Sequence, residues 1–142
     1  MFTSPPPPPH LARLAMIVAA ILLVVVTGLL LIPMPDHGLE APGNIDKLVH
    51  FVMFFCVAFP ALVGAPRFWP HIMLGLIIYG GVVELIQPQF GRHADWGDFV
   101  ANSLGVVAAF PVALAARFWI GSKRRQRAQR NRTGEDNRIA DL

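Results

Sequence analysis

Polar side chains that could do chemistry gather in three short blocks of an otherwise apolar chain. Carboxylates beside a histidine can transfer protons, and lysine with arginine can hold an anionic head group. An ionisable group inside a membrane span costs about 2.5 to 3.5 kcal/mol on insertion scales, so such groups in a membrane protein mark candidate functional positions. The candidate ligand-binding residues are Asp46, Lys47, His50, Glu84, Gln87, Arg92, Asp95, Asp98 and Asn102.

Glu84 is the member of this set that is hardest to explain by surface solvation. It lies between Val82-Val83 and Leu85-Ile86, so apolar side chains flank it on both sides. A carboxylate in such surroundings must be paired, hydrated or protonated. Burial can tune a carboxyl group for proton transfer near neutral pH, which makes Glu84 with His50 the candidate catalytic pair.

The other members also have ordinary interpretations. Asp46 and Asp98 could be carboxylates at helix N-termini, where the helix dipole favours negative charge. Lys47 could extend its ammonium group to the lipid head groups. Arg92, with His93, could belong to a solvated loop.

Metal and thiol chemistry receive little support from spacing. His50, Glu84, Asp95 and Asp98 are of metal-ligating types, but they match no strong signature such as H-E-x-x-H. We therefore expect no metal and no cofactor. Cys56 is the only cysteine and lies in an apolar run, so the chain has no internal disulfide and no cysteine-rich site.

The elements that must position these residues are apolar runs. The 142 residues are 54% hydrophobic and 15% charged, whereas a soluble domain carries about 25% charge. Runs at about 13–32, 47–65, 69–87 and 98–120 are long enough to cross a bilayer. The first run is longer than the apolar part of a signal peptide, so we expect an uncleaved span. We predict an all-α membrane protein whose domain, 13–120, is a four-transmembrane-helix bundle.

Flanking segments set the expected orientation. A proline-rich arm, 1–12, precedes the bundle, and a tail, 121–142, carries seven of the chain's twelve lysines and arginines. Basic segments stay in the cytoplasm, so we expect both termini there. We expect the tail to be disordered beyond its first helical turns and to contact anionic lipids, and we expect no nucleic-acid partner. All three polar blocks then face outward.

Spacing also predicts which faces turn inward. Asp46 and His50 are four residues apart and share a helix face, as do Glu84 and Gln87 at three apart. Small residues continue the face that carries Asp98 and Asn102, and this pattern permits close helix packing. These small residues are Ala101, Gly105, Ala109 and Ala113. Gly80 lies four residues before Glu84, so we expect a similar close-packing position there.

The three blocks resemble motifs of the VanZ-like family of small bacterial integral membrane proteins. Asp46-Lys47-Leu48-Val49-His50-Phe51 is similar to that family's DKxxHf, and Glu84-Leu85-Ile86-Gln87 to its E-x-x-Q. Gly91-Arg92 with the segment from Asp95 to Gly105 is similar to its R…DxxDlxaNtlG block. The resemblance implies a multi-pass protein of the bacterial cytoplasmic membrane, with the nine polar residues as candidates only. The family is named for a protein associated with resistance to teicoplanin, which acts on cell-wall precursors outside the membrane.

Three functions follow as hypotheses. The protein binds or modulates an envelope lipid or a cell-wall precursor, with a link to glycopeptide-antibiotic tolerance. Alternatively, it is a membrane-embedded enzyme that acts on lipid-linked phosphate or sugar. In the third hypothesis the polar residues only hold the helices together, through hydrogen bonds that each contribute about 0.6 to 2 kcal/mol.

Overall fold

The computed structural model describes residues 7–32, 43–92 and 94–140, and this part of the chain forms only helices and short connections. Four helices are long and apolar enough to cross a membrane, which confirms the predicted all-α, multi-pass character. The elements are α1 (Pro9–Leu31), α2 (Gly43–Gly64), the 3-10 turn η1 (Pro66–Phe68), α3 (Trp69–Ile86), the 3-10 turn η2 (Gln87–Phe90) and α4 (Trp96–Ala140).

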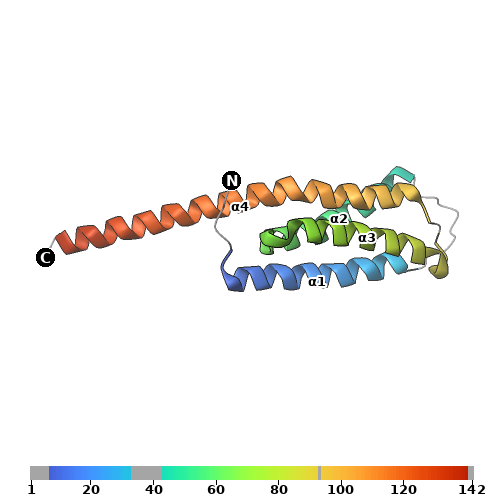
Figure 1. Ribbon diagram of the computed structural model, residues 1–142, viewed down its shortest axis with the longest axis horizontal. Coiled ribbons are helices and arrows are strands. Elements are labelled where there is room, and N and C mark those ends of the chain that lie inside the picture. Colours follow the sequence, from blue (N-terminus) through green and yellow to red (C-terminus); the bar gives the residue numbers. More distant parts are fainter. Residues whose placement is uncertain (1–6, 33–42, 93, 141–142) are drawn as a thin grey trace.

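The four helices run side by side, and α4 continues well beyond the other three (Figure 1). The start of α1 and the extension of α4 lie at the same end of the bundle, which we call the basic end (Figure 1). At the opposite end lie the start of α2, the end of α3 and the start of α4 (Figure 1). We call this second end the polar end, because all three candidate blocks belong to it.

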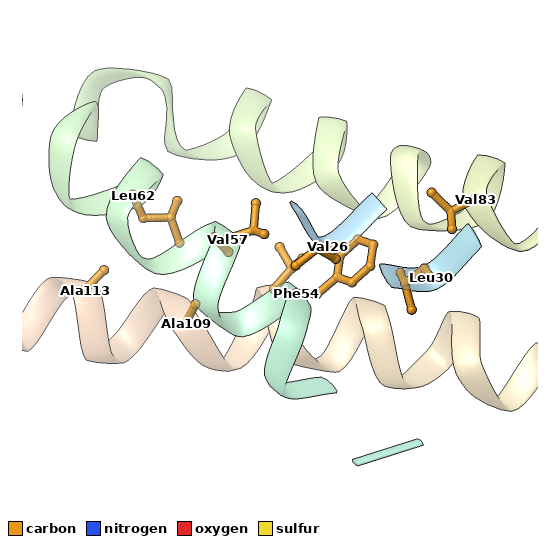
Figure 2. Packing of buried hydrophobic residues seen from close by; sticks show 10 residues of the cluster. Val26, Leu30, Phe54, Val57, Leu62, Val83, Ala109 and Ala113 are labelled. Atoms are coloured by element: carbon orange, nitrogen blue, oxygen red, sulfur yellow. The ribbon is translucent and has the colours of Figure 1, made fainter. Parts of the chain in front are cut away.

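Helix α2 is the centre of the packing, with its most extensive contacts to α4 and then to α1. Figure 2 shows the buried side chains that meet there from all four helices. Phe54 and Leu62 of α2 are at most 1% exposed, while Val24 and Leu85 on the outside are more than 70% exposed. A buried interior inside an apolar exterior is the arrangement that a bilayer requires of a helical bundle.

Small residues let α2 and α4 approach closely, as their spacing predicts. Ala101, Ala109 and Ala113 are all buried on one face of α4. A Cβ atom on Gly105 would lie 2.2 Å from the backbone oxygen of Phe51, so these two helices meet backbone to backbone. Gly80 is similarly confined, because its Cβ would lie 3.2 Å from the Phe54 ring.

Side-chain hydrogen bonds at the basic end cap the buried carboxyl terminus of α2. The indole Nε1 of Trp69 donates to the backbone oxygen of Leu62 at 2.6 Å, and Arg117 donates to that of Val63 at 3.0 Å. The last carbonyl groups of a helix have no partner within the helix, so these two side chains supply them. Arg117, within the predicted fourth span, is buried in the bundle at 6% exposure.

The chain after residue 120 differs from the expected disorder, since α4 continues as one helix to Ala140. Arginine, lysine, glutamine and alanine dominate this segment and are all good helix formers. The Lys123 ammonium group also lies 3.7 Å from the centre of the Trp119 ring, which ties the extension to the membrane-spanning part.

The proline-rich arm lies partly outside the described residues, which begin at Pro7. Pro8 has φ −57° and ψ 148°, in the polyproline II region. Helix α1 begins at Pro9, earlier than the expected start near residue 13. Proline is well tolerated in the first helical turn. The N–H groups of that turn have no hydrogen-bond partner within the helix, so proline, which lacks an N–H, loses no bond there.

Candidate functional site

The structure brings eight of the nine candidate residues into one connected cluster at the polar end. Five of the nine side chains are at most 5% exposed, although all are polar or ionisable. The buried five are His50, Glu84, Gln87, Asp98 and Asn102. His93 lies outside the described residues. Three separate stretches of chain, in α2, at the end of α3 and in α4, thus direct hydrophilic groups into the interior instead of toward the lipid.

His50 of α2 and Asn102 of α4 form the innermost contact of the cluster. Nδ1 of His50 lies 3.1 Å from Oδ1 of Asn102. An amide oxygen only accepts, so this contact places the proton of the neutral ring on Nδ1. The other ring nitrogen, Nε2, lies 3.9 Å from Oδ2 of Asp98. The close approach at Gly105, one turn along α4, brings these side chains within reach of each other.

Two ion pairs connect the start of α2 to the segment between α3 and α4. Nζ of Lys47 donates to Oδ2 of Asp95 at 2.6 Å and lies 3.8 Å from Oδ1 of Asp98. Arg92 donates to Oδ1 of Asp46 at 3.4 Å. The Lys47 ammonium group, followed by the N–H of Gly97, holds the pKa of Asp95 below its usual range.

Asp95 is also the N-cap residue of α4, whose first helical residue is Trp96. Its Oδ1 accepts from the N–H of Gly97 at 2.7 Å, as an N-cap aspartate does. A Cβ on Gly97 would lie 2.2 Å from Cε of Lys47, so a larger residue here would require the flexible lysine side chain to move aside. In the segment from Asp95 to Asp98, the first aspartate thus caps α4 and the glycine leaves space for the Lys47 side chain.

Glu84 makes its contact with the backbone of this cap. Its Oε1 accepts from the N–H of Asp95 at 2.6 Å. Its Oε2 is buried and has no hydrogen-bond partner. Among the described residues no hydrogen bond joins the two members of the expected catalytic pair, Glu84 and His50.

Gln87 has a different partner from the rest of the set. Its Nε2 donates at 3.1 Å to the backbone oxygen of Leu30, near the end of α1. The α1 carbonyl would otherwise be unpaired in an apolar interior, so this contact has a structural explanation. Of the nine candidates, Gln87 is the one whose contact leads away from the cluster.

Four buried side-chain atoms in the cluster have no hydrogen-bond partner in the described part of the chain. They are Nε2 of His50, Oε2 of Glu84, Oδ1 of Asp98 and Nδ2 of Asn102. Asp98 Oδ1 has only the longer approach of Lys47 at 3.8 Å. Buried polar groups are nearly always paired, so a group of four such atoms indicates a site that another molecule, ion or water completes.

An apolar groove runs along α3 and α4 beside the cluster. Its volume is about 410 Å³, and among the described residues that line it Glu84 is the only ionisable one. The lining is completed by Ile77, Ile78, Gly81, Val82, Leu85, Ala94, Trp96 and Phe99. A second hollow of about 460 Å³ lies across α4, with Lys47 and Trp96 among its lining residues. Trp96, which is 81% exposed, therefore stands between the two hollows.

The sequence analysis did not identify the groove. Most of the side chains that line it are apolar residues that nothing in the sequence distinguishes from other membrane-facing residues. They form a groove only because of the way in which α3 packs against α4. The one local signal is Trp96, a large aromatic residue between two aspartates at a helix start. Comparison of the chain with family models, curated proteins and solved structures finds no match in any of the three.

Proposed function

We propose that this is a VanZ-like protein of the bacterial cytoplasmic membrane that binds an envelope lipid or a lipid-linked cell-wall precursor at its polar end. The observation that carries the proposal is the apolar groove with Glu84 in its wall. A lipid has an apolar chain joined to a polar head, and the groove with the adjoining cluster offers both environments side by side.

The groove accounts for the chain of such a ligand. Ile78, Val82 and Leu85 are exposed on α3, so an acyl or isoprenoid chain can reach them from the bilayer. The Phe99 ring forms part of the facing wall on α4. The bilayer around the groove is as apolar as the groove itself, so a bound chain gains little from hydrophobicity. The groove therefore distinguishes between lipid chains mainly by their shape.

Glu84 and its neighbours account for the head. Oε2 of Glu84 is an unused acceptor, so it suits a hydroxyl, amide or ammonium group on the head group. Lys47 lines the second hollow on the other side of Trp96 and supplies donors. A sugar or peptide attached to a lipid carries donors and acceptors of both kinds.

The proposed orientation puts this head on the outer side. Arg124, Arg125, Arg127, Arg130 and Arg132 lie on the α4 extension at the basic end. The positive-inside rule assigns that end to the cytoplasm, and the polar end then faces the cell wall. A site there can reach cell-wall precursors, the target of glycopeptide antibiotics.

A groove-filling variant tests lipid binding directly. Ile78→Trp puts a large ring into the groove, and Leu74→Trp is its matched control, one turn along the same face of α3 and equally exposed at 59% against 58%. We expect purified Ile78→Trp protein to retain several-fold less co-purified lipid by native mass spectrometry, while Leu74→Trp matches the wild type. Equal retention by both variants would contradict the proposal.

A cellular test addresses the antibiotic link. Cells that lack the protein are compared with cells that carry Glu84→Ala at wild-type abundance, and sensitivity to teicoplanin is measured. We expect Glu84→Ala to reproduce the null strain. Wild-type sensitivity in Glu84→Ala cells, where the null strain differs, would exclude a role for this site in tolerance.

An enzyme remains the second candidate because of His50, whose free Nε2 lies 3.9 Å from Asp98. In that case His50 with Asp98 would exchange protons with a lipid-linked phosphate or sugar. Incubation of the purified protein with such lipids should release product, and His50→Gln should abolish the release. No turnover across a lipid panel would leave binding as the function.

A further inference from the structure

We propose that Asp46, His50 and Asp98 form a binding site for a divalent transition-metal ion, with Zn²⁺ or Mn²⁺ as the ions that suit its ligands. The three residues come from the start of α2 and the start of α4. This inference does not depend on lipid binding, because it rests on a different set of atoms from those that line the groove.

The geometry brings three ligand atoms together. One ligand atom from each residue lies within 4.8 Å of the other two. A metal with bonds of about 2.0 to 2.2 Å would draw them inward by on the order of 1 Å. The Asp46 side chain is 32% exposed, so it has room to rotate toward His50. Three protein ligands leave open positions on the metal, as in catalytic and ligand-binding centres.

The orientation of His50 supports a metal ligand more strongly than the distances alone. In the neutral ring, a proton on Nδ1 donates to Asn102 and leaves Nε2 with a lone pair. This lone pair faces the Asp98 carboxylate at 3.9 Å, and Nε2 has no hydrogen-bond partner although the His50 side chain is only 1% exposed. Two electron-rich groups that face each other in a buried space repel, and a cation between them would turn this repulsion into two bonds.

Asn102 has the role that second partners of metal-bound histidines commonly have. A metal-ligating histidine usually donates its other N–H to a carboxylate, a carbonyl group or water, which fixes the ring. The His50 to Asn102 contact is such an arrangement.

The charge of the cluster points the same way. It contains four carboxylates, from Asp46, Glu84, Asp95 and Asp98, and two cations, Lys47 and Arg92. With the carboxylates ionised and His50 neutral, two negative charges remain, which one divalent cation neutralises. Glu84 and Asp98 are buried, where uncompensated charge is costly, so a cation is a better occupant than an anion.

Spacing could not reveal this site. The residues of metal-ligating type that we selected from the sequence did not include Asp46, which lies more than 50 positions from Asp98. Only the packing of α2 against α4 at Gly105 brings the two aspartates beside the same histidine.

The test uses the full-length protein, purified in detergent, treated with EDTA and titrated with Co²⁺ as a spectroscopic substitute. We expect one equivalent of Co²⁺ with visible absorption bands of a nitrogen- and oxygen-ligated ion, and displacement by Zn²⁺. Asp46→Asn and Asp98→Asn should each weaken binding by more than about tenfold, and Asn102→Ala by about 10- to 100-fold. Ser103→Ala is the control, because it removes a polar group from the same stretch of α4 whose hydroxyl donates to the Phe99 carbonyl of its own helix.

Each outcome decides the matter. Binding by Asp46→Asn as tight as in the wild type, equal loss in Ser103→Ala, or no bound Co²⁺ would overturn the proposal. No bound Co²⁺ would assign the space between His50 and Asp98 to a shared proton. Asp98→Asn and Asn102→Ala alter the buried interior and could fail to fold. Asp46→Asn then decides, because Asp46 is partly exposed and lies at the edge of the bundle.

Discussion

Gly105→Ala tests whether the backbone contact between α2 and α4 positions the polar site. The added Cβ would lie 2.2 Å from the Phe51 oxygen and 3.1 Å from both the Phe51 carbon and the Phe55 nitrogen. Real Cβ atoms essentially never come closer than 3.0 Å to such atoms. All three neighbours are backbone atoms of α2, so no side-chain rotation can relieve the overlap. The two helices must therefore move apart by on the order of 1 Å.

The magnitude follows from two opposing effects. Overpacking of this kind costs about 1 to 3 kcal/mol, and a backbone clash belongs at the upper end of the range. Alanine regains up to about 1 kcal/mol over glycine in a helix. We expect a net loss of about 1 to 2 kcal/mol, which lowers the midpoint of thermal unfolding in detergent by several degrees.

Gly75→Ala is the matched control. Gly75 lies within α3, and a Cβ there would meet nothing within 4 Å. The control should be neutral or slightly stabilising, because only the helix propensity changes. Separation of α2 from α4 should also lengthen the contact between His50 and Asn102, so Gly105→Ala should bind metal more weakly while Gly75→Ala does not. Equal stability of the two variants would refute the close approach.

Three further predictions concern individual contacts and the orientation. Gln87→Leu should destabilise the protein by about 1 to 2 kcal/mol in detergent, because the buried Leu30 oxygen loses its donor; Gln89→Leu, at an exposed position, should have little effect. Lys47 lowers the pKa of Asp95, so their contact stabilises the folded state fully above the ordinary aspartate pKa and is lost as the pH falls through the lowered value. Unfolding measured between about pH 2 and 6 should therefore show a loss of stability in acid that is smaller in Asp95→Asn, and identical pH profiles would contradict this contact. A GFP fusion after Leu142 should fluoresce and an alkaline phosphatase fusion should be inactive, whereas the reverse would place the polar end in the cytoplasm.

The sequence predicts the fold well because lipid imposes simple rules. Uncharged runs of sufficient length must become helices, and the four runs correspond to α1, α2, α3 and the first part of α4. The small residues around Gly105 identified the face that α4 presents to α2. Proline and arginine were less informative, since α1 begins at Pro9, inside the predicted arm, and Arg117, within the predicted fourth span, caps α2.

The candidate site was predicted as a set of residues but not as a set of contacts. Periodicity places Asp46 and His50 on one face, yet it cannot say that Asn102 meets Nδ1 while Asp98 faces Nε2. Gln87 shows the same limit. It belongs to the same motif as Glu84, but its partner is a backbone carbonyl of α1, which only the tertiary arrangement supplies.

The unpartnered atoms bear on the hypothesis that the polar residues only lock the helices together. A network selected for packing satisfies its members, because each unpaired buried group costs about 1 to 3 kcal/mol. Gln87 fits that description, since its amide reaches a carbonyl that needs it. His50, Glu84 and Asp98 do not, because each keeps a buried atom without a hydrogen-bond partner. If packing were their only purpose, apolar residues of similar size would hold α2, α3 and α4 together at lower cost. A variant with leucine or methionine at these three positions and at Asn102, which would otherwise lose its partner His50, should be at least as stable as the wild type in detergent. It should also lose bound lipid and metal; full retention of both would leave packing as the explanation.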